Sequence, residues 1–260
     1  MMIKILFISD IVGEPGRNIL TQRVPEIVDK ESPDFIIANA ENAAGGKGLT
    51  DSTAREIFNA GVDVLTLGNH AFARKEIEEI INDPSIIRPA NYPSNVQGRG
   101  YGIYNIDGKG KIAVINLMGR VYLPNIDCPF RKAVEVLEEI GNETKVIFVD
   151  FHAEVTSEKV AMGLHLDGKV SAVIGTHTHI PTADERILPN GTAYLTDAGM
   201  TGPRDGVIGM DKEVVFKRFL TGLPHHYVIA KGQVIMQGCI LEIYPDTGKA
   251  KSIKRFSILG

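Results

Sequence analysis

Short hydrophobic runs alternate with helix-like segments over the first two-thirds of the chain, a pattern that predicts parallel βαβ units. Five of these runs read as buried strands, and each of them ends on Asp, Glu, Asn or His. The five runs cover residues 4–10, 35–42, 62–70, 146–152 and 173–179. Helical periodicity and stop signals predict helices between them, at residues 19–30, 52–60, 74–82 and 130–140.

The later part of the chain changes to an antiparallel pattern. Turn sequences predict hairpins that pair residues 101–106 with 111–117 and residues 187–188 with 193–195. A short helix is predicted at residues 214–220, followed by a meander of strands at 227–229, 234–244 and 250–258. The chain of 260 residues shows no repeat and no Ser/Pro-rich linker. This order of elements therefore favours one α/β domain over residues 1–260.

Composition narrows the class of protein. The net charge is −4 and the pI about 6.0, so no basic surface invites duplex nucleic acid. The two cysteines, Cys128 and Cys239, have no metal-binding spacing and are predicted to be buried thiols, with a disulfide as the alternative. No stretch is apolar for long enough to span a membrane, and we expect a cytoplasmic protein. Antiparallel edges in the second half leave room for a homo-oligomer.

The strand-end residues form a candidate metal site. Sites in open α/β sheets lie beyond the carboxyl ends of strands, so side chains that end different strands can meet. The candidate ligands are Asp10, Glu41, Asn42, Asn69, His152, His177 and His179. A single Asp or Asn after a strand is ordinarily a turn or cap, and a lone His a core residue, but their combination at five strand ends favours a shared site.

This ligand set predicts two metal ions. Oxygen and imidazole ligands without a thiolate suit Mn, Fe or Zn, and seven ligands are too many for one ion. Glu41 is the best candidate for a bridging carboxylate. His177 and His179 are two residues apart, so an extended chain would point both to one side and deliver one imidazole to each ion.

Charge and spacing also suggest a reaction. Two divalent ions carry +4, whereas Asp10, Glu41 and a hydroxide supply about −3, which leaves a positive surplus for a phosphate. If the chain is extended at Asn69 and His70, Asn69 faces the metals and His70 faces the substrate. A His side chain with a pKa near neutral is suited to donate a proton to a leaving alkoxide.

The glycine-rich loops do not match nucleotide-binding motifs. Residues 43–48 contain Gly-Lys without the spacing or the Ser/Thr of a P-loop, and residues 13–17 lack the spacing of a dinucleotide-binding turn. These loops instead let the backbone approach the metals closely. Arg17 and Lys47 could reach a phosphate from them, although solvated side chains are the ordinary interpretation. The flexible segment 201–206 is a candidate rim or lid.

Taken together, these motifs resemble those of the calcineurin-like metallophosphoesterases. The fuller strings are similar to those of the YmdB subfamily over essentially the whole chain. They are Asp10-Ile11-Val12-Gly13, Glu41-Asn42-Ala43-Ala44-Gly45-Gly46, Leu67-Gly68-Asn69-His70, Asp150-Phe151-His152-Ala153-Glu154, residues 175–184 and residues 197–203. The wider superfamily usually has Asp-x-His at the first motif and an acid after Asn-His, whereas this chain has Val12 and Ala71, as the subfamily does.

The resemblance implies a fold, a cofactor and a reaction. The fold would be a two-layer β sandwich flanked by helices (α/β/β/α). The cofactor would be a di-iron or di-manganese centre, with iron as the expected metal and zinc as another alternative. The implied enzyme is a metal-dependent phosphoric diester hydrolase acting on small cyclic nucleotides such as 2′,3′-cAMP, through attack by a metal-bound hydroxide.

Individual roles follow from the same resemblance. Asp10, Asn42 and His179 would bind one ion, and Asn69, His152 and His177 the other. Glu41 would bridge the two ions, and His70 would be the proton donor. Two alternatives stay open: a phosphomonoesterase or nuclease of the same superfamily, and a regulatory protein whose metal site senses a ligand or holds a partner.

Overall fold

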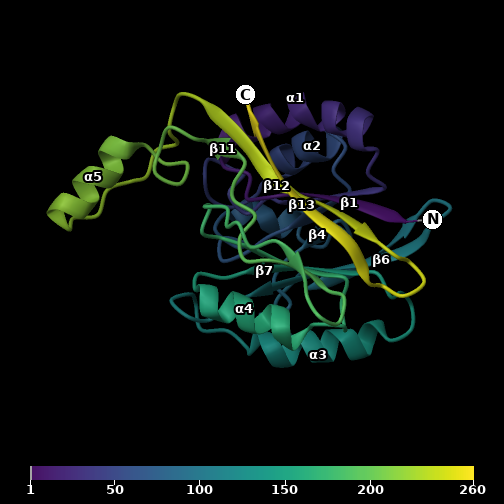
Figure 1. Cartoon of the computed structure of the whole chain (residues 1–260). Coiled ribbons are helices and arrows are strands. Elements are labelled where there is room, and N and C mark those ends of the chain that lie inside the picture. The colour runs from purple at the N-terminus through teal and green to yellow at the C-terminus, as the bar shows by residue number, and fades with distance from the viewer. Residues whose placement is uncertain (1) are drawn as a thin grey trace.

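A computed structural model of the chain describes residues 2–260 and contains two β-sheets packed face to face (Figure 1). The first sheet has seven strands in the order β11-β12-β1-β2-β3-β4, with β13 paired to β12. Its strands are β1 (Ile3–Ile8), β2 (Phe35–Asn39), β3 (Val64–Thr66), β4 (Ile86–Ile87), β11 (Gly202–Pro203), β12 (Val234–Ile243) and β13 (Ala250–Leu259). From β1 to β4 the pairing is parallel, whereas β12 is antiparallel to β1.

The second sheet has six strands in the order β5-β6-β7-β8-β10-β9. They are β5 (Tyr101–Ile106), β6 (Gly110–Met118), β7 (Ile147–His152), β8 (Ala172–Thr176), β9 (Arg186–Ile187) and β10 (Ala193–Leu195). The predicted hairpins are confirmed, because β5 pairs with β6 and β9 with β10 in antiparallel fashion. The central pairs β6–β7 and β7–β8 are parallel.

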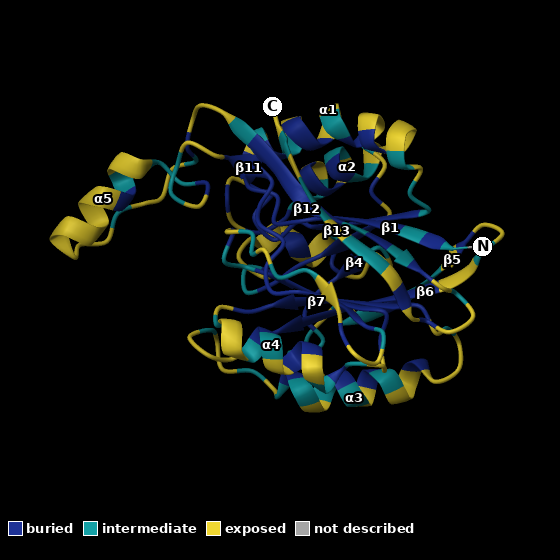
Figure 2. Cartoon of the chain, viewed as in Figure 1, coloured by how far each residue is buried: buried dark blue, intermediate teal, exposed yellow. Residues whose placement is uncertain are grey.

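A continuous apolar core joins the facing surfaces of the two sheets. Phe7 of β1 packs against Phe148 of β7 with ring centroids 5.0 Å apart, and Ile5, Ile174 and Leu241 belong to the same fully buried cluster. Burying each side chain of this size contributes roughly 1.5–3 kcal/mol. Most strands of both sheets are dark blue in Figure 2, whereas β13 at one side of the first sheet is partly exposed. The packing of this core sets the position of one sheet relative to the other.

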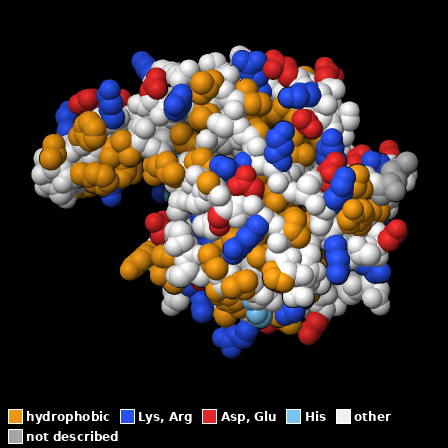
Figure 3. Space-filling view, in the orientation of Figure 1, with side chains coloured by type: hydrophobic (Ala, Val, Ile, Leu, Met, Phe, Trp, Pro, Cys, Tyr) orange, Lys and Arg blue, Asp and Glu red, His pale blue; other side chains and the backbone are white. Residues whose placement is uncertain are grey.

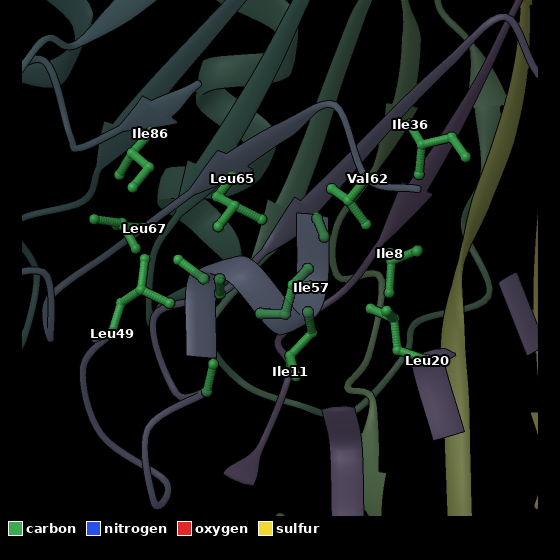
Figure 4. Close-up of a cluster of buried hydrophobic side chains, with 14 of the residues drawn as sticks. Ile8, Ile11, Leu20, Ile36, Leu49, Ile57, Val62, Leu65, Leu67 and Ile86 are labelled. Atoms are coloured by element: carbon green, nitrogen blue, oxygen red, sulfur yellow. The ribbon is translucent and has the colours of Figure 1, made fainter. Parts of the chain in front are cut away.

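Two pairs of helices cover the outer faces of the sheets. Helices α1 (Gly13–Glu31) and α2 (Asp51–Asn59) lie over the first sheet, and α3 (Pro129–Ile140) and α4 (Thr156–His165) over the second (Figure 1). Leu20 of α1 and Ile57 of α2 pack with strand residues such as Ile8 and Leu65 (Figure 4). The layers therefore follow the predicted α/β/β/α order.

Local sequence signals account for several helix ends. The Thr50 side chain accepts a hydrogen bond from the Thr53 backbone N–H, and the Thr53 side chain accepts one from the Thr50 N–H, which forms a capping box before α2. Helix α3 begins with Pro129, where a missing N–H costs nothing, and stops before Gly141. These signals are local, which explains why the boundaries of α2 and α3 were predictable.

Other boundaries differ from the prediction. Helix α1 begins at Gly13 rather than Ile19 because Pro15 lies in the first turn, where its missing N–H is tolerated. A Cβ on Gly16 would collide with the Thr201 carbonyl, so a glycine that looked like part of a loop is needed for close packing.

Three further segments were assigned incorrectly. Residues Lys75–Glu79 form a short 3₁₀ helix, η1, instead of an α-helix over 74–82. Helix α4 was not anticipated, because its short sequence carries Gly163 and a narrow apolar stripe. The strand predicted at 227–229 is reduced to an isolated bridge between Ile229 and Met210.

Helix α5 (Lys212–Thr221) projects from the body of the molecule (Figure 1). Asp211 caps its first turn by accepting hydrogen bonds from the backbone N–H groups of residues 213 and 214. Phe219 and Leu220 are 75% and 86% exposed, and hydrophobic side chains gather on this arm in Figure 3.

The cysteines are free thiols, and the disulfide alternative is wrong. Cys239 is buried as predicted, whereas Cys128 is only partly buried. Within residues 2–260, no helix is long and apolar enough to cross a bilayer.

Candidate metal centre

The candidate ligands come together where strands of both sheets end. Asp10 and Glu41 follow β1 and β2 of the first sheet, while His152 ends β7 of the second and His177 follows β8. Because β1 and β2 are parallel neighbours, as are β7 and β8, their carboxyl ends lie side by side. All seven predicted ligands lie in this one region.

One group of ligand atoms closes around a common point. The Nε2 atom of His152 lies 3.0 Å from Asn69 Oδ1, 3.1 Å from Glu41 Oε1 and 3.0 Å from His177 Nδ1. Ligands about 2.1 Å from one ion lie roughly 3.0–3.4 Å from each other. The three distances from His152 Nε2 therefore fit ligands of one divalent ion, and Glu41, His152 and His177 could hold it.

A second group lies beside the first and shares Glu41. The Asp10 Oδ1 atom is buried and has no hydrogen-bond partner among the described residues. His179 Nε2 is 3.7 Å from that oxygen and 3.2 Å from the Asn42 amide nitrogen, which is 3.2 Å from Glu41 Oε1. An unpartnered buried carboxylate oxygen is costly, and a cation here would satisfy it. As a ligand, Asn42 would turn its amide to present oxygen, an orientation that heavy-atom positions alone do not fix.

A glycine leaves room for the first of these groups. A Cβ on Gly68 would lie 2.5 Å from His152 Nε2 and even closer to Glu41 Oε2. Gly68 has no left-handed backbone conformation that would itself demand glycine. Glycine is therefore needed here because a side chain would occupy the space between the ligands, and not because of the backbone conformation of the turn.

Each histidine has its second ring nitrogen engaged, which leaves the other free for a metal. His152 Nδ1 is 2.9 Å from Thr176 Oγ1, whose hydroxyl donates to Asp150 Oδ1 at 2.7 Å. His177 Nε2 is 2.8 Å from a Glu154 carboxylate oxygen. Carboxylates that orient metal-binding imidazoles in this way raise their basicity and fix their tautomers.

The third histidine is oriented by the backbone. His179 Nδ1 is 3.0 Å from the carbonyl oxygen of Ile208, which can accept a hydrogen bond from its N–H. His179 is therefore set to offer Nε2, as His152 is, whereas His177 offers Nδ1. Nothing in the sequence indicated this difference between the two histidines of the His-Thr-His motif.

Charges in the cluster are strongly coupled. Burial alone would lower the pKa of His152, but the nearby Glu41 and Asp10 carboxylates outweigh it and raise the pKa to about 9. Burial and the adjacent His152 lower the pKa of His177 to about 3. Burial would raise the pKa of Glu41, but His152 and His70 hold it well below its usual range. Burial raises the pKa of Asp10 despite the attraction of His179 and His152. Cations in the cluster would replace the proton on His152.

The backbone of the His-Thr-His motif is not extended, contrary to the prediction. Strand β8 ends at Thr176, and His177 and His179 have φ angles of 95° and 64°. Such left-handed conformations cost residues other than glycine about 1–3 kcal/mol each and occur mainly where surrounding structure enforces them. The two imidazoles still reach different ligand groups, but through a strained turn.

Asn69 and His70 also lie in a turn and not in an extended strand. The His70 backbone N–H donates to Glu41 Oε2 at 2.9 Å, and its Nδ1 is 2.8 Å from Asn42 Oδ1. Its side chain is 28% exposed, whereas that of Glu41 is 1% exposed. His70 therefore lies between the buried ligands and solvent, although the alternation predicted for an extended chain is wrong.

A cavity of about 620 Å³ opens over the ligands. Glu41, Asn42, His70, His177 and His179 line its inner end. Its outer wall is built by residues that the sequence did not mark as functional. They are Arg74 after the third strand, and Val207, Ile208, Met210, Val215, Phe219, His225, His226 and Tyr227 from α5 and its flanking loops.

Two expectations about phosphate contacts and a lid need correction. Arg17 is bound to Glu56 at 2.5 Å and to the Ala43 carbonyl at 2.6 Å, so it is not directed at the cavity, whereas Lys47 lines it. Residues 201–203 are buried, and β11 pairs with β12, which removes them from any lid. The rim of the cavity begins at Val207.

The chain matches known proteins over almost its full length. A family model described as YmdB-like protein matches residues 6–256. The chain is 50% identical over 256 residues to the 2′,3′-cyclic-nucleotide 2′-phosphodiesterase of Bacillus subtilis (strain 168), covering 98% of this chain and 97% of that protein. It is 36% identical to a putative phosphatase/phosphodiesterase of Mycoplasma genitalium, covering 99% and 93% of the two chains.

Solved structures agree with this. A hypothetical protein from Thermus thermophilus has a TM-score of 0.93 at 39% identity, covering 99% of both chains. A phosphatase from Mycoplasma pneumoniae has a TM-score of 0.94 at 34% identity, covering 100% of this chain and 94% of that one. The predicted fold class, the α/β/β/α sandwich of the metallophosphoesterases, is confirmed. Within that class, the chain belongs to the YmdB-like family.

Proposed function

We propose that this chain is a dinuclear metallophosphodiesterase that hydrolyses small cyclic nucleotides, with 2′,3′-cyclic nucleotides as its substrates. Its class, metal-dependent phosphoric diester hydrolase, is that of the family. The narrower substrate is supported by the name of the Bacillus subtilis relative at 50% identity. The observation that carries the proposal is the pair of ligand groups that share Glu41 beneath one cavity.

The proposed ligand assignment follows that pairing. Asn69, His152 and His177 hold one ion, supported by the 3.0–3.1 Å spacings around His152 Nε2. Asp10, Asn42 and His179 hold the other, supported by the unpartnered Asp10 oxygen. Glu41 would bridge the two, supported by its Oε1 atom, which lies 3.1 Å from His152 Nε2 and 3.2 Å from the Asn42 amide nitrogen. Iron is the expected metal, with manganese or zinc as alternatives.

Two divalent ions bound here would supply positive charge for the phosphate and lower the pKa of a bound water. The protein's own task is to hold the phosphate against the ligands and to move one proton. His70 is proposed to donate that proton to the leaving ribose oxygen. Its exposure at the inner end of the cavity supports this role, as does its Nδ1 contact with Asn42, which holds the ring in place.

The cavity wall supports a nucleotide of limited size. Ile208, Phe219 and Tyr227 offer an apolar and aromatic surface at the outer end, opposite the polar ligands. A nucleobase has a flat face that stacks on such side chains. The guanidinium of Arg218 lies 4.9 Å from the Tyr227 ring centroid and braces one aromatic side chain of the wall.

The whole chain is proposed to act as one domain. Residues from both halves build the core between the sheets, and the ligands also come from both halves. The expected cytoplasmic location and homo-oligomer stay predictions.

A comparative assay tests the proposed substrate. Purified protein would be supplied with 2′,3′-cAMP, 3′,5′-cAMP and a simple phosphate monoester, each with Mn²⁺ or Fe²⁺. We expect the highest kcat/KM for 2′,3′-cAMP, and a preference for the monoester would reject the proposal. The variant Glu41→Gln, which removes the bridging charge but keeps the size, should abolish turnover of every substrate. A partner that binds this variant as well as the native protein would favour the regulatory alternative.

A further inference from the structure

A buried ion pair lies directly behind the His-Thr-His turn. Lys159 of α4 reaches Asp197 with its Nζ 2.6 Å from Oδ2, and both side chains are almost fully buried at 2% and 1% exposure. The two residues are far apart in sequence, and neither is among the proposed metal ligands. A lysine is almost never buried to this extent unless it is paired.

Asp197 uses the same oxygen to hold Thr178. Its Oδ2 accepts a hydrogen bond from the Thr178 hydroxyl at 2.6 Å and one from the Thr178 backbone N–H at 3.2 Å. Its other oxygen accepts from the Gly199 N–H at 2.9 Å. Every hydrogen bond that Asp197 makes through Oδ2 therefore ends on Lys159 or on Thr178.

Thr178 is the residue between the two left-handed histidines. His177 and His179, at φ 95° and 64°, keep conformations that residues with a Cβ rarely adopt. A turn of this kind must be stabilised by contacts with other segments. Asp197 accepts hydrogen bonds from both the backbone and the side chain of its central residue, Thr178. Side-chain contacts of the two histidines orient their rings, whereas the hydrogen bonds from Thr178 to Asp197 hold the turn on which both histidines lie.

Strand β8, next to the ion pair, has a glycine where the pair packs against it. A Cβ on Gly175 would collide with the Thr196 carbonyl and would lie 3.1 Å from the Lys159 Cδ atom. Glycine at this position lets the Lys159 stem and the 196–199 segment pack closely against the end of β8. The Ala198 N–H donates to the Gly175 carbonyl at 2.9 Å and fixes that approach.

We propose that Lys159 and Asp197 are positioning residues, which hold Thr178 so that His177 and His179 face two different metal ions. Lys159 balances the negative charge of Asp197. A carboxylate can therefore hold Thr178 in a buried region that already contains the carboxylates of Asp10 and Glu41. This inference rests on the proposed dinuclear centre, but it does not depend on which phosphate ester is hydrolysed.

Mn²⁺ binding to the metal-free full-length protein tests the proposal. The number and affinity of bound ions would be measured by the electron paramagnetic resonance of free Mn²⁺, and pairing of the ions by the exchange-coupled signal at low temperature. Thr178→Val removes the hydroxyl at a partly exposed position and keeps the backbone N–H. We expect it to fold, to bind Mn²⁺ about 10–100-fold more weakly, as losses of outer-shell partners do, and to lose the coupled signal.

Further variants separate positioning from simple stability. Thr178→Ser keeps the hydroxyl and should restore paired binding. Lys159→Met keeps the apolar stem without the charge and should behave like Thr178→Val. The matched control is Thr192→Val, at a buried threonine whose hydroxyl bonds the Val170 carbonyl at 2.7 Å, and it should bind two ions normally.

The outcomes are distinct. Native affinity and a native coupled signal in folded Thr178→Val or Lys159→Met would overturn the proposal, as would an equal loss in Thr192→Val or failure of serine to restore pairing. None of these measurements uses a nucleotide. If the native protein binds paired ions but does not hydrolyse cyclic nucleotides, only the proposed substrate fails.

Discussion

The space that Gly68 leaves between the metal ligands allows a sharp test of the site. Replacing Gly68 by alanine would place a Cβ 2.5 Å from His152 Nε2. Real Cβ atoms essentially never approach a heavy atom within 3.0 Å, so the Cβ and the ring nitrogen must separate by at least 3.0 − 2.5 = 0.5 Å more. Metal–ligand distances are held to about 0.2 Å, and a shift of this size takes the nitrogen out of bonding position.

Gly68→Ala should therefore remove metal and leave the fold intact. The backbone at this position is acceptable for alanine, so the strain falls on Glu41 and His152 and not on the turn. We expect affinity for the ion at His152 to fall at least about 100-fold, the upper range seen when only an outer partner of a ligand is lost. Metal content after dialysis, measured by inductively coupled plasma mass spectrometry, and circular dichroism would check both parts.

A matched alanine substitution controls for generic crowding. A Cβ on Gly102 of β5 would meet the end of the Tyr104 side chain, which can move, at a sheet edge away from the ligands. Gly102→Ala should keep two ions per chain. The reasoning would be refuted if Gly68→Ala kept its full metal content and turnover, because the ligands would then not need the space that the structure assigns to them.

Three further predictions concern the same centre. His70→Ala should keep both metals but lose about 10²–10⁴-fold in kcat, the usual contribution of a general acid; full turnover in steady-state assays would exclude the role. Asp150→Asn should lower the free energy of unfolding by about 2–3 kcal/mol, because buried donors lose a charged acceptor; urea denaturation of the metal-free variant measures this, and an unchanged midpoint would contradict it. Metal binding at pH 7 should release a proton. The pKa of His152 is about 9 in the metal-free fold, against 6.5 for a free side chain, so the ring stays charged until a cation displaces its proton. The stabilisation from this charge is fully present below pH 6.5 and is lost as the pH rises through about 9. Titration calorimetry in buffers of different ionisation enthalpy should show the proton release, and identical heats in all buffers would rule it out.

The candidate ligand set could be proposed from the sequence because each candidate lies in a local pattern. Asp10, Glu41 and His152 each follow or end a hydrophobic run that reads as a buried strand. Neighbouring parallel strands bring such strand ends to one edge of a sheet, so the side chains that follow them are expected to lie close together. The four-layer fold came from the resemblance of the motifs and from the order of strands and helices.

The supporting parts could not be predicted for a physical reason. Lys159 and Asp197 meet only after folding, and neither lies in a pattern that marks it as buried or paired. The left-handed turn at His177 arises from tertiary contacts that override the extended preference of a strand end. The cavity wall from α5 was missed because exposed residues such as Phe219 and His226 look like ordinary surface positions in a sequence.

The geometry of the centre depends on contacts that cross between the sheets. Asp10 and Glu41 follow strands of the first sheet, whereas His152 and His177 end or follow strands of the second. How the two sheets pack therefore sets the spacing between the candidate ligands of one sheet and those of the other. Asp150 of β7 joins them beneath the ligands. Its carboxylate accepts hydrogen bonds from Asn39 at 2.9 Å and Thr66 at 2.5 Å, both on the first sheet.

These cross-sheet hydrogen bonds continue to both sides of the candidate metal centre. Asn39 Oδ1 accepts from the Glu41 backbone N–H at 3.2 Å, and Thr176 links Asp150 to His152. One buried carboxylate thus holds the proposed bridging ligand on one sheet and an imidazole ligand on the other. Burial raises its pKa to about 6 against the opposing effect of His152 and its three hydrogen-bond donors. Asp150 therefore links the packing of the two sheets to the positions of Glu41 and His152.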